Sequence, residues 1–468
     1  MSNQYDKLIT GNSVYEKTKK RNVYYYQSYQ GGDTYKKGEH LSKYSNESEA
    51  EYEDRVQSTP LDNHCKGVVS VYNSFLFRKD IHREWGSLEN DPAIPQLEND
   101  ADLEGRSLNS FMKEANTLAS VFGMMWICVS KPNSNANTRA EELNQNIRPY
   151  LSMISPLMML DWNYTRSNSG HYILDYVKYI EEQSDIHTVI KEWYPEVVVT
   201  TVTDNDKREV KETVTEPNGI GRVPVVAHYT ERSSVRGKGV SLIADIADLQ
   251  RAIYNEYSEV EQTIRLSNAA SLVKTADTEA GAGPGAIIQM SDGMDPALKP
   301  YLLQPSGASV DSIYNSIDKR IAAIDRIAHL GAIRETTAKT MSGVSRSMEF
   351  EQLNAKLSDI ADALELTEEN IMRIVAAYQG LAWDGVIDYP DSFNIRDENA
   401  DLDFYLKASV APINSATYKR EINAAIARLV IGDDSEAMAE ILVELDNPAP
   451  SLDQIANSIV NNNDDSTT

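Results

Sequence analysis

A single helical run of unusual length most constrains the fold of this chain. From residue 348 to residue 383, apolar side chains recur every three or four positions with no proline to interrupt them. At 1.5 Å per residue such a helix is about 50 Å long, which exceeds the width of a small domain. It needs a packing partner along most of its length, as in proteins that work in assemblies. Its apolar stripe consists of Leu353, Leu357, Ile360, Leu364, Ile371, Ile374 and Tyr378.

The charge balance excludes two broad classes of protein. The chain has 468 residues, with 45 Lys and Arg against 71 Asp and Glu, so its formal net charge is −26. Together with 41% hydrophobic residues, this excludes a wholly disordered chain and a generic basic nucleic-acid binder. Cys65 and Cys128 are too few for a disulfide framework, so we expect small buried side chains in a reducing compartment. No 18-residue uncharged apolar stretch occurs, so we expect an intracellular protein that spans no membrane.

The hydrophobic pattern predicts an α+β fold. Residues 1–45 are rich in Tyr, Lys and Gly and poor in aliphatic side chains, which predicts an extended arm that docks on a partner. Helices are expected at 47–56, 61–77 and 107–122. From Met124 onward, short alternating runs bounded by Asn, Asp, Gly or Pro predict the strands of a mixed or antiparallel sheet.

The second half of the chain predicts a pair of helices around a small insert. Residues 242–270 and 308–331 keep helical spacing, and the insert at 271–307 holds apparent strands and a turn. A stretch of Thr, Ser, Gly and cations at 332–347 has no periodicity and precedes the long helix. The run DFYLKASV at 403–410 predicts a strand. Further helices are expected at 418–430, 435–445 and 452–460.

The sequence contains none of the common catalytic or cofactor-binding motifs, such as a phosphate-binding loop, an H-E-x-x-H helix, a G-x-S-x-G elbow or a C-x-x-C pair. The nearest candidate, GAGPGA at 281–286, is interrupted by Pro284, so we interpret it as a flexible turn. We therefore predict no catalytic residue, no cofactor and no metal site. The acidic residues Asp245, Asp248 and Glu259 fit either an ordinary solvated helix face or the wall of a wet channel.

The order of these pieces resembles the portal proteins of tailed bacteriophages, the head-to-tail connectors, over roughly residues 46–410. EYEDRVQSTPLDNHCKGVVSVYNSFLFRKD resembles the opening helical pair of that family, and RPYLSMISPLMMLDWNY with GRVPVVAHY resembles strands of its wing. The resemblance implies these parts in chain order: an N-terminal arm (1–45), a wing (46–241), a first stem helix (242–270), a clip (271–307), a second stem helix (308–331), a tunnel loop (332–347), a long channel helix (348–383), a wing return strand (384–414) and a helical crown with a tail (415–468).

The resemblance also implies a function. Portals form a ring of about twelve copies at one capsid vertex and conduct double-stranded DNA during packaging and ejection, without sequence specificity. The implied partners are the terminase large subunit, later the head-tail adaptor proteins, and the major capsid and scaffold proteins. The implied location is the virion, with the host cytoplasm during assembly. The alternative from another class is a soluble hydrolase with an unrecognised acidic active site.

Three groups of residues are the expected contact sites under this resemblance. The cations of the tunnel loop would touch DNA phosphates, with Lys339 the first candidate, although they could instead pair with Glu335, Glu349 or a neighbouring subunit. The clip turn would face terminase and then the adaptors. The tunnel-loop set is Arg334, Thr337, Lys339, Thr340, Ser342 and Arg346; the clip set is Asp292, Gly293, Asp295 and Pro296; the channel-lining acidic set is Asp245, Asp248 and Glu259.

Overall fold

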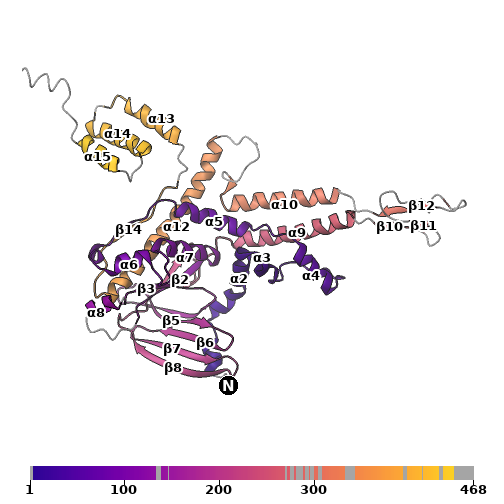
Figure 1. Cartoon of the computed structure of the whole chain (residues 1–468), viewed down its shortest axis with the longest axis horizontal. Helices are drawn as coiled ribbons and strands as arrows, with labels where there is room; N and C mark the ends of the chain where they lie inside the picture. Colours follow the sequence, from indigo (N-terminus) through magenta and orange to yellow (C-terminus); the bar gives the residue numbers. More distant parts are fainter. Residues whose placement is uncertain are drawn as a thin grey trace, which may run out of the picture. The chain divides into compact units, whose positions relative to one another are not determined.

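The computed structural model describes residues 4–132, 139–145, 147–268, 271–274, 279–280, 288–289, 295, 300–303, 308–331, 343–393, 398–413, 415–431 and 436–446. The chain divides into two compact units, Met1–Phe393 and Asn394–Thr468, and each is described by itself. The first unit combines helices with antiparallel sheets, and the described part of the second is helical. The predicted α+β class is therefore confirmed (Figure 1).

The N-terminal segment is helical, so the prediction of an extended arm at residues 1–45 is wrong. It forms α1 (Gln4–Ile9), α2 (Ser13–Gln30) and α3 (Gly32–Lys36). The side chain of Asn12 caps α2 by accepting hydrogen bonds from the first backbone amides of the helix.

In the N-terminal segment, tyrosine side chains provide buried apolar surface in place of aliphatic side chains. Tyr35 is fully buried and Tyr24 is 8% exposed, and the Tyr24 hydroxyl donates to the Ala247 carbonyl at 2.6 Å. Aromatic side chains bury about 150–250 Å² each, so a few of them can anchor a segment that has little Leu, Ile or Val. The scarcity of aliphatic residues was therefore a poor guide to this segment.

Three predicted helices are confirmed in the next part of the chain, with small shifts at their ends. They are α4 (Glu49–Ser58), α5 (His64–Leu76) and α7 (Leu108–Phe122), where α7 is capped by Ser107 and ends at Gly123. Helix α7 contacts α2, α5 and α6, and its apolar face is buried in the main core. Shorter elements between α5 and α7 are β1 (His82–Glu84), the 3₁₀ turn η1 (Gly86–Leu88) and α6 (Ala93–Asn99).

The long helix is confirmed as α12 (Gly343–Tyr378), which has 36 residues, begins before the expected residue 348 and ends before the expected residue 383. Leu353, Leu357, Ile360 and Leu364 are all 0% exposed. The helix contacts α5, β2 (Met124–Ser130), β9 (Val225–Tyr229) and β14 (Val386–Asp388), so its apolar stripe is covered from several directions. This answers the requirement that so long a helix be packed along its length.

Two antiparallel sheets follow α7. In the first, β2 (Met124–Ser130) lies between β3 (Tyr150–Ile154) and β9 (Val225–Tyr229), and every residue of β2 is buried. This sheet contacts α7 and α12. The second sheet is a meander of β4 (Met159–Arg166), β5 (Tyr172–Gln183), β6 (His187–Trp193), β7 (Val197–Asp204) and β8 (Glu209–Pro217), in that order. The short helix α8 (Arg139–Asn144) lies between β2 and β3 in the sequence.

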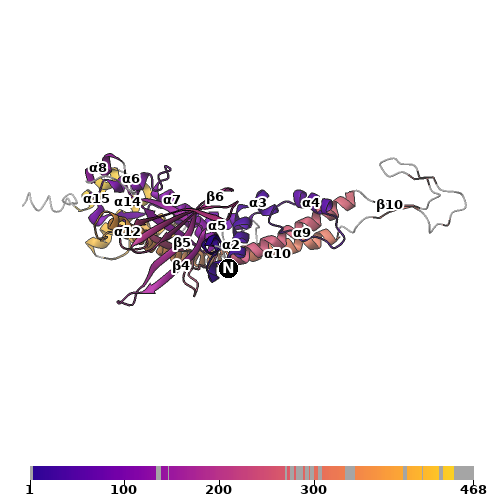
Figure 2. The same cartoon turned by 90° about the horizontal axis from the view of Figure 1, so that it is seen from below.

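The predicted helix pair is confirmed as α9 (Ala244–Asn268) and α10 (Ala308–Ile327), which lie side by side (Figures 1 and 2). In the insert between them, β10 (Ser271–Val273) pairs antiparallel with β13 (Tyr301–Leu303), directly beyond the end of α9. A second short pair joins β11 (Glu279–Ala280) to β12 (Ile288–Gln289).

The predicted strand at 403–410 is wrong, because this run lies mostly in α13 (Glu398–Ser409). Within 384–414, expected as a wing return strand, the described strand is β14 (Val386–Asp388), which pairs with β1, and the unit boundary falls at Phe393. The strand was predicted from the alternation of apolar residues in this run. In the structure, Phe404 and Leu406 lie on a helix and both side chains are exposed. Helices α14 (Ala416–Ile431) and α15 (Glu436–Asp446) confirm two C-terminal predictions; the one at 452–460 lies outside the described residues.

A buried polar chain ties three elements of the first unit together. His228 on β9 is 0% exposed, and its Nδ1 and Nε2 atoms lie 3.0 Å from the Thr367 hydroxyl on α12 and the Asn116 carbonyl oxygen on α7. The Asn116 amide then donates to the Asn73 side chain on α5 at 2.8 Å. In the neutral imidazole, Nε2 donates to the Asn116 carbonyl oxygen. Burial lowers the pKa of His228 from 6.5 to about 4.

His228 should make the stability of the first unit pH-dependent. Its folded pKa lies below its unfolded value of 6.5, so its contribution is fully present above pH 6.5 and falls as pH drops toward 4. The fall should reach about 3 kcal/mol, since each pKa unit is worth about 1.4 kcal/mol. Urea unfolding of His228→Gln should show a correspondingly shallower pH slope. The exposed His82→Gln is the control, and equal slopes for His228→Gln and the wild type would contradict the assignment.

Candidate functional site

The structure places only part of the predicted site. Arg334, Thr337, Lys339, Thr340 and Ser342 lie outside the described residues, so their expected contacts with DNA stay predictions. Arg346 lies on the first turns of α12, so the expected loop at 332–347 already becomes helical at Gly343. In the clip set, Asp292, Gly293 and Pro296 lie outside the described residues, and Asp295 is exposed.

The helix pair is held by an apolar seam and a polar clasp. Ile253 on α9 is 1% exposed, and Ile317 and Ile324 on α10 are 2% and 0% exposed within the same core cluster. The Glu256 carboxylate on α9 accepts from the Ser316 hydroxyl at 2.7 Å and from Arg320 Nε at 3.0 Å. The two helices therefore form one packed unit that projects toward the β10–β13 pair.

The three acidic candidates are exposed on α9, as both sequence interpretations require. Asp245 and Glu259 form no ion pair within the described ranges, whereas Asp248 is paired. Arg21 on α2 donates to both oxygens of Asp248, at 2.6 and 3.1 Å. Burial alone would raise the pKa of Asp248, but the Arg21 hydrogen bond and charge outweigh it and hold the pKa below its usual value. The exposed acidic face of α9 thus contains two uncompensated carboxylates and one neutralised one.

Helix α4 braces α9, a role that the sequence analysis did not predict. Arg55 on α4 is 2% exposed and donates to the Ser258 hydroxyl on α9 at 3.0 Å. Its charge is matched by Glu47 at 2.7 Å, and its guanidinium lies 4.1 Å from the Tyr44 ring. A buried guanidinium needs such partners because an unpaired charge is costly away from water. The available signal was the capping box that opens α4, formed by Ser48 and Glu51.

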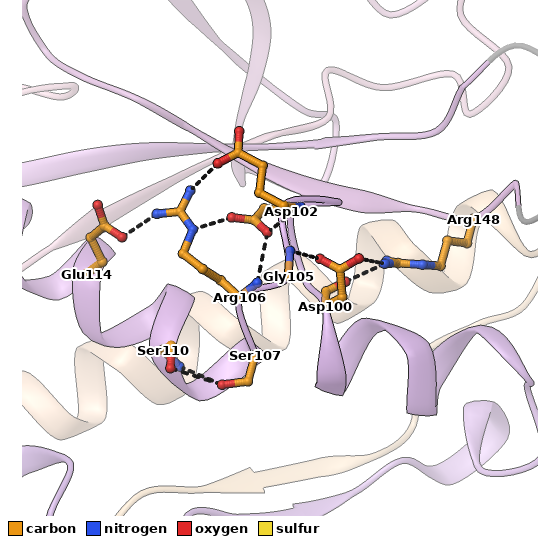
Figure 3. A network of polar contacts seen from close by, with 9 residues as sticks. Asp100, Asp102, Gly105, Arg106, Ser107, Ser110, Glu114 and Arg148 are labelled. Carbon is orange, nitrogen blue, oxygen red and sulfur yellow. Dashed lines mark hydrogen bonds and ion pairs between the residues drawn. The ribbon is translucent and has the colours of Figure 1, made fainter.

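A second cluster of charges fixes the loop before α7 rather than forming a site. Figure 3 shows Arg106 pointing toward Asp102 and Glu114, while Arg148 Nη2 lies 2.9 Å from an oxygen of Asp100. Burial opposes ionisation of Asp102, but amide hydrogen bonds and Arg106 hold its pKa below the usual value. Each carboxylate in this cluster is paired with a guanidinium, so the cluster stabilises the loop.

The two cysteines lie in the core of the first unit. Cys65 and Cys128 are both 0% exposed, which confirms the prediction of small buried side chains, and burial raises the pKa of each thiol. Across the described ranges, no group of three or more His, Cys, Asp or Glu side chains is placed to hold a metal ion. No helix in that part of the chain is long and apolar enough to span a membrane.

Comparisons with known proteins give distant structural neighbours. No family model and no curated protein match the chain. The neck of an empty GTA particle, computed with C6 symmetry, matches with a TM-score of 0.41 and 8% identity, over 78% of this chain and 91% of that chain. The virion of a native gene transfer agent particle matches with a TM-score of 0.40 and 9% identity, over 77% and 89%. The neck of the native particle, computed with C12 symmetry, gives 0.39 and 9%, over 76% and 89%.

These neighbours are particle-neck and virion structures. The TM-scores describe a distant likeness, so the proposal below rests on the residues and contacts of this chain.

The apolar seam between α9 and α10 should be essential to the first unit. Ile324→Ala leaves a cavity at a fully buried position and should lower the free energy of unfolding by about 2–5 kcal/mol. Ile327→Ala on the same helix, where the side chain is 42% exposed, should change it by less than about 0.5 kcal/mol. Denaturant unfolding checks both variants. Equal losses would show that the two helices are not packed through this seam.

Proposed function

We propose that this chain is a portal-type protein, a ring-forming conduit for double-stranded DNA at one vertex of a capsid. One observation carries the proposal: two antiparallel helices, α9 and α10, are packed into a single unit that ends in the β10–β13 pair, and a 36-residue helix, α12, follows them in the same unit. This is the order of stem, clip, stem and channel helix that the resemblance implies. We place about twelve copies in the ring, in a closed head-to-tail arrangement.

The charge of the chain suits a conduit that must not hold its cargo. A ring of about twelve copies, each of net charge −26, presents many carboxylates to a passing duplex. Tight binding to DNA needs Lys and Arg that neutralise phosphates and release counterions, and an acidic wall denies this. The exposed Asp245 and Glu259 on α9 are our candidates for that wall, with Asp248 a weaker one because Arg21 neutralises it.

We assign the contacts with DNA and with partner proteins to the two segments that flank α10 in the sequence. We assign Arg334, Lys339 and Arg346 of the tunnel segment to weak, sequence-independent contacts with phosphates. The clip segment at residues 292–296 would bind the terminase large subunit and later the head-tail adaptor proteins. During assembly in the host cytoplasm, the major capsid and scaffold proteins would contact the ring at one capsid vertex. In the virion, the ring would occupy that vertex.

The purified chain should form a closed ring with a central opening. Twelve copies of 52.3 kDa give about 630 kDa, which native mass spectrometry resolves from neighbouring copy numbers. Negative-stain class averages should show the opening and rotational symmetry. A compact monomer or dimer, stable across salt and protein concentration, would contradict the proposal and favour the soluble hydrolase instead.

Lys339→Ala should change DNA movement without changing the ring. Removing one weak phosphate contact per copy should slow packaging into capsids severalfold, because the cations at position 339 are lost around the ring while Arg334, Arg346 and the acidic wall remain. The measurement is the rate of DNA packaging by particles that carry the variant. Lys207→Ala, an exposed position in the turn between β7 and β8, is the control. A normal packaging rate with Lys339→Ala would remove this residue from the proposed DNA contacts.

A further inference from the structure

A basic groove runs along α2 in a chain whose overall charge is strongly negative. The groove has a volume of about 1030 Å³ and lies between α2, the turn after α3, and α9. It contains six cations and two carboxylates, Glu16 and Glu39, for a local formal charge of +4. The cations are Lys17, Lys19, Lys20, Arg21, Lys37 and Arg251.

Most of this positive charge is not neutralised within the chain. In the part of the chain that the structure describes, Lys17, Lys20, Lys37 and Arg251 form no ion pair, and Arg21 alone has a carboxylate partner. Lysine ammonium groups that no neighbouring carboxylate neutralises create a positive electrostatic potential at the surface. The groove is therefore suited to an acidic occupant.

A matching acidic surface lies on α4. Its first turns carry four exposed carboxylates, of which Glu49 pairs with Lys43. Glu53 and Asp54 form no ion pair with any residue that the structure describes. We call this set the α4 acidic face; it consists of Glu49, Glu51, Glu53 and Asp54. The opposite side of α4 is occupied, because Tyr52 and Val56 pack into a small core cluster.

The basic groove and the α4 acidic face are held apart within one chain. Helix α2 is fixed to α9 at Ala247 through the Tyr24 hydroxyl, and α4 is fixed to α9 at Ser258 through Arg55. Eleven helical positions separate the two anchors, which is about 16 Å along the axis of α9. Because α9 is a rigid helix, it keeps the basic groove and the α4 acidic face apart within one copy. Both surfaces are therefore available to contact other copies.

We propose that the α4 acidic face of one copy seats in the basic groove of the next copy, and that this contact repeats around the ring. Two different patches of the same chain make such a contact head-to-tail, which is the arrangement that closes into a ring. Glu53 and Asp54, which form no ion pair with any described residue, would face the unpaired lysines of the groove, fix the register of neighbouring copies and speed their association. The inference rests on the proposed function for the ring itself and assigns the residues that hold it together.

Charge reversal tests the contact directly. Lys17→Glu, Lys19→Glu and Lys20→Glu together change the formal charge of the groove from +4 to −2, and Glu49→Lys, Glu53→Lys and Asp54→Lys change that of the α4 acidic face from −4 to +2. Each triple variant should stay folded by circular dichroism but associate at least about tenfold more weakly, because like charges then face each other. Native mass spectrometry and sedimentation velocity at low and high salt measure this. Lys113→Glu, Lys207→Glu and Lys419→Glu, at three exposed lysines outside the groove, make the same change in net charge as the groove variant and should leave the ring intact.

Mixing the two reversed variants gives the decisive arm. In a ring of alternating copies, each reversed groove meets a reversed α4 and each native groove meets a native α4, so an equimolar mixture should restore rings. A folding defect or a general charge effect would not be rescued in this way. Rings that persist in both variants alone, or that fail to return on mixing, would overturn the contact while leaving the proposed function standing.

Two further outcomes separate the competing explanations. A wild-type chain that forms no ring at any salt concentration overturns the proposed function and this contact together. Reversed-groove rings that assemble normally but lose retention of a duplex DNA probe at low salt would show that the groove holds nucleic acid instead of a second copy. That result would also overturn the contact.

Discussion

A buried carboxylate on α12 sets the positions of segments from both ends of the first unit. Glu368 is 0% exposed; Arg83 on β1 donates to one of its oxygens at 2.5 Å, and the Tyr389 hydroxyl after β14 donates to the other at 2.6 Å. A carboxylate so deep in the core must keep these partners, because losing one leaves an uncompensated charge away from water. Its neighbour Thr367 contacts His228, so one turn of α12 anchors elements on several sides.

The same logic of paired charges explains how α9 is held. Arg21 on α2 and Arg55 on α4 bind α9 at Asp248 and Ser258. The apolar seam with α10 packs along the same helix. The helix pair is therefore braced by the start of the chain as well as by its own hairpin partner. This bracing supports our proposal that α9 and α10 act as one rigid element beside a DNA channel. It also fixes the spacing between the basic groove and the α4 acidic face.

Much of the fold could be predicted because long amphipathic helices carry a strong local signal. Helices α7, α9, α10 and α12 follow from the spacing of their apolar residues alone. The N-terminal helices could not be predicted in this way, because tyrosines such as Tyr24 and Tyr35 supply their buried surface. The strand predicted at 403–410 failed because a short alternating run also fits a helix with exposed apolar residues.

The candidate site could be predicted less well than the fold, for a physical reason. Whether Asp248 is free or paired depends on Arg21, which lies 227 positions away, and no local pattern reports that contact. The Lys-rich composition of residues 1–45 was visible in the sequence, but it did not indicate that the fold brings Lys37 and Arg251 beside the cations of α2 in one groove. Pairings across a fold depend on tertiary packing, which residue spacing does not encode.

The central claim is that copies of this chain surround a channel with their helix pairs. A cryo-electron microscopy reconstruction of the purified assembly tests it most directly, because helices at this length are recognisable at intermediate resolution. The account predicts a ring in which the α9–α10 pairs enclose the opening, with the β10–β13 pairs together at one end. An assembly without a continuous opening, or one in which these helix pairs lie on the outer surface away from the axis, would contradict it.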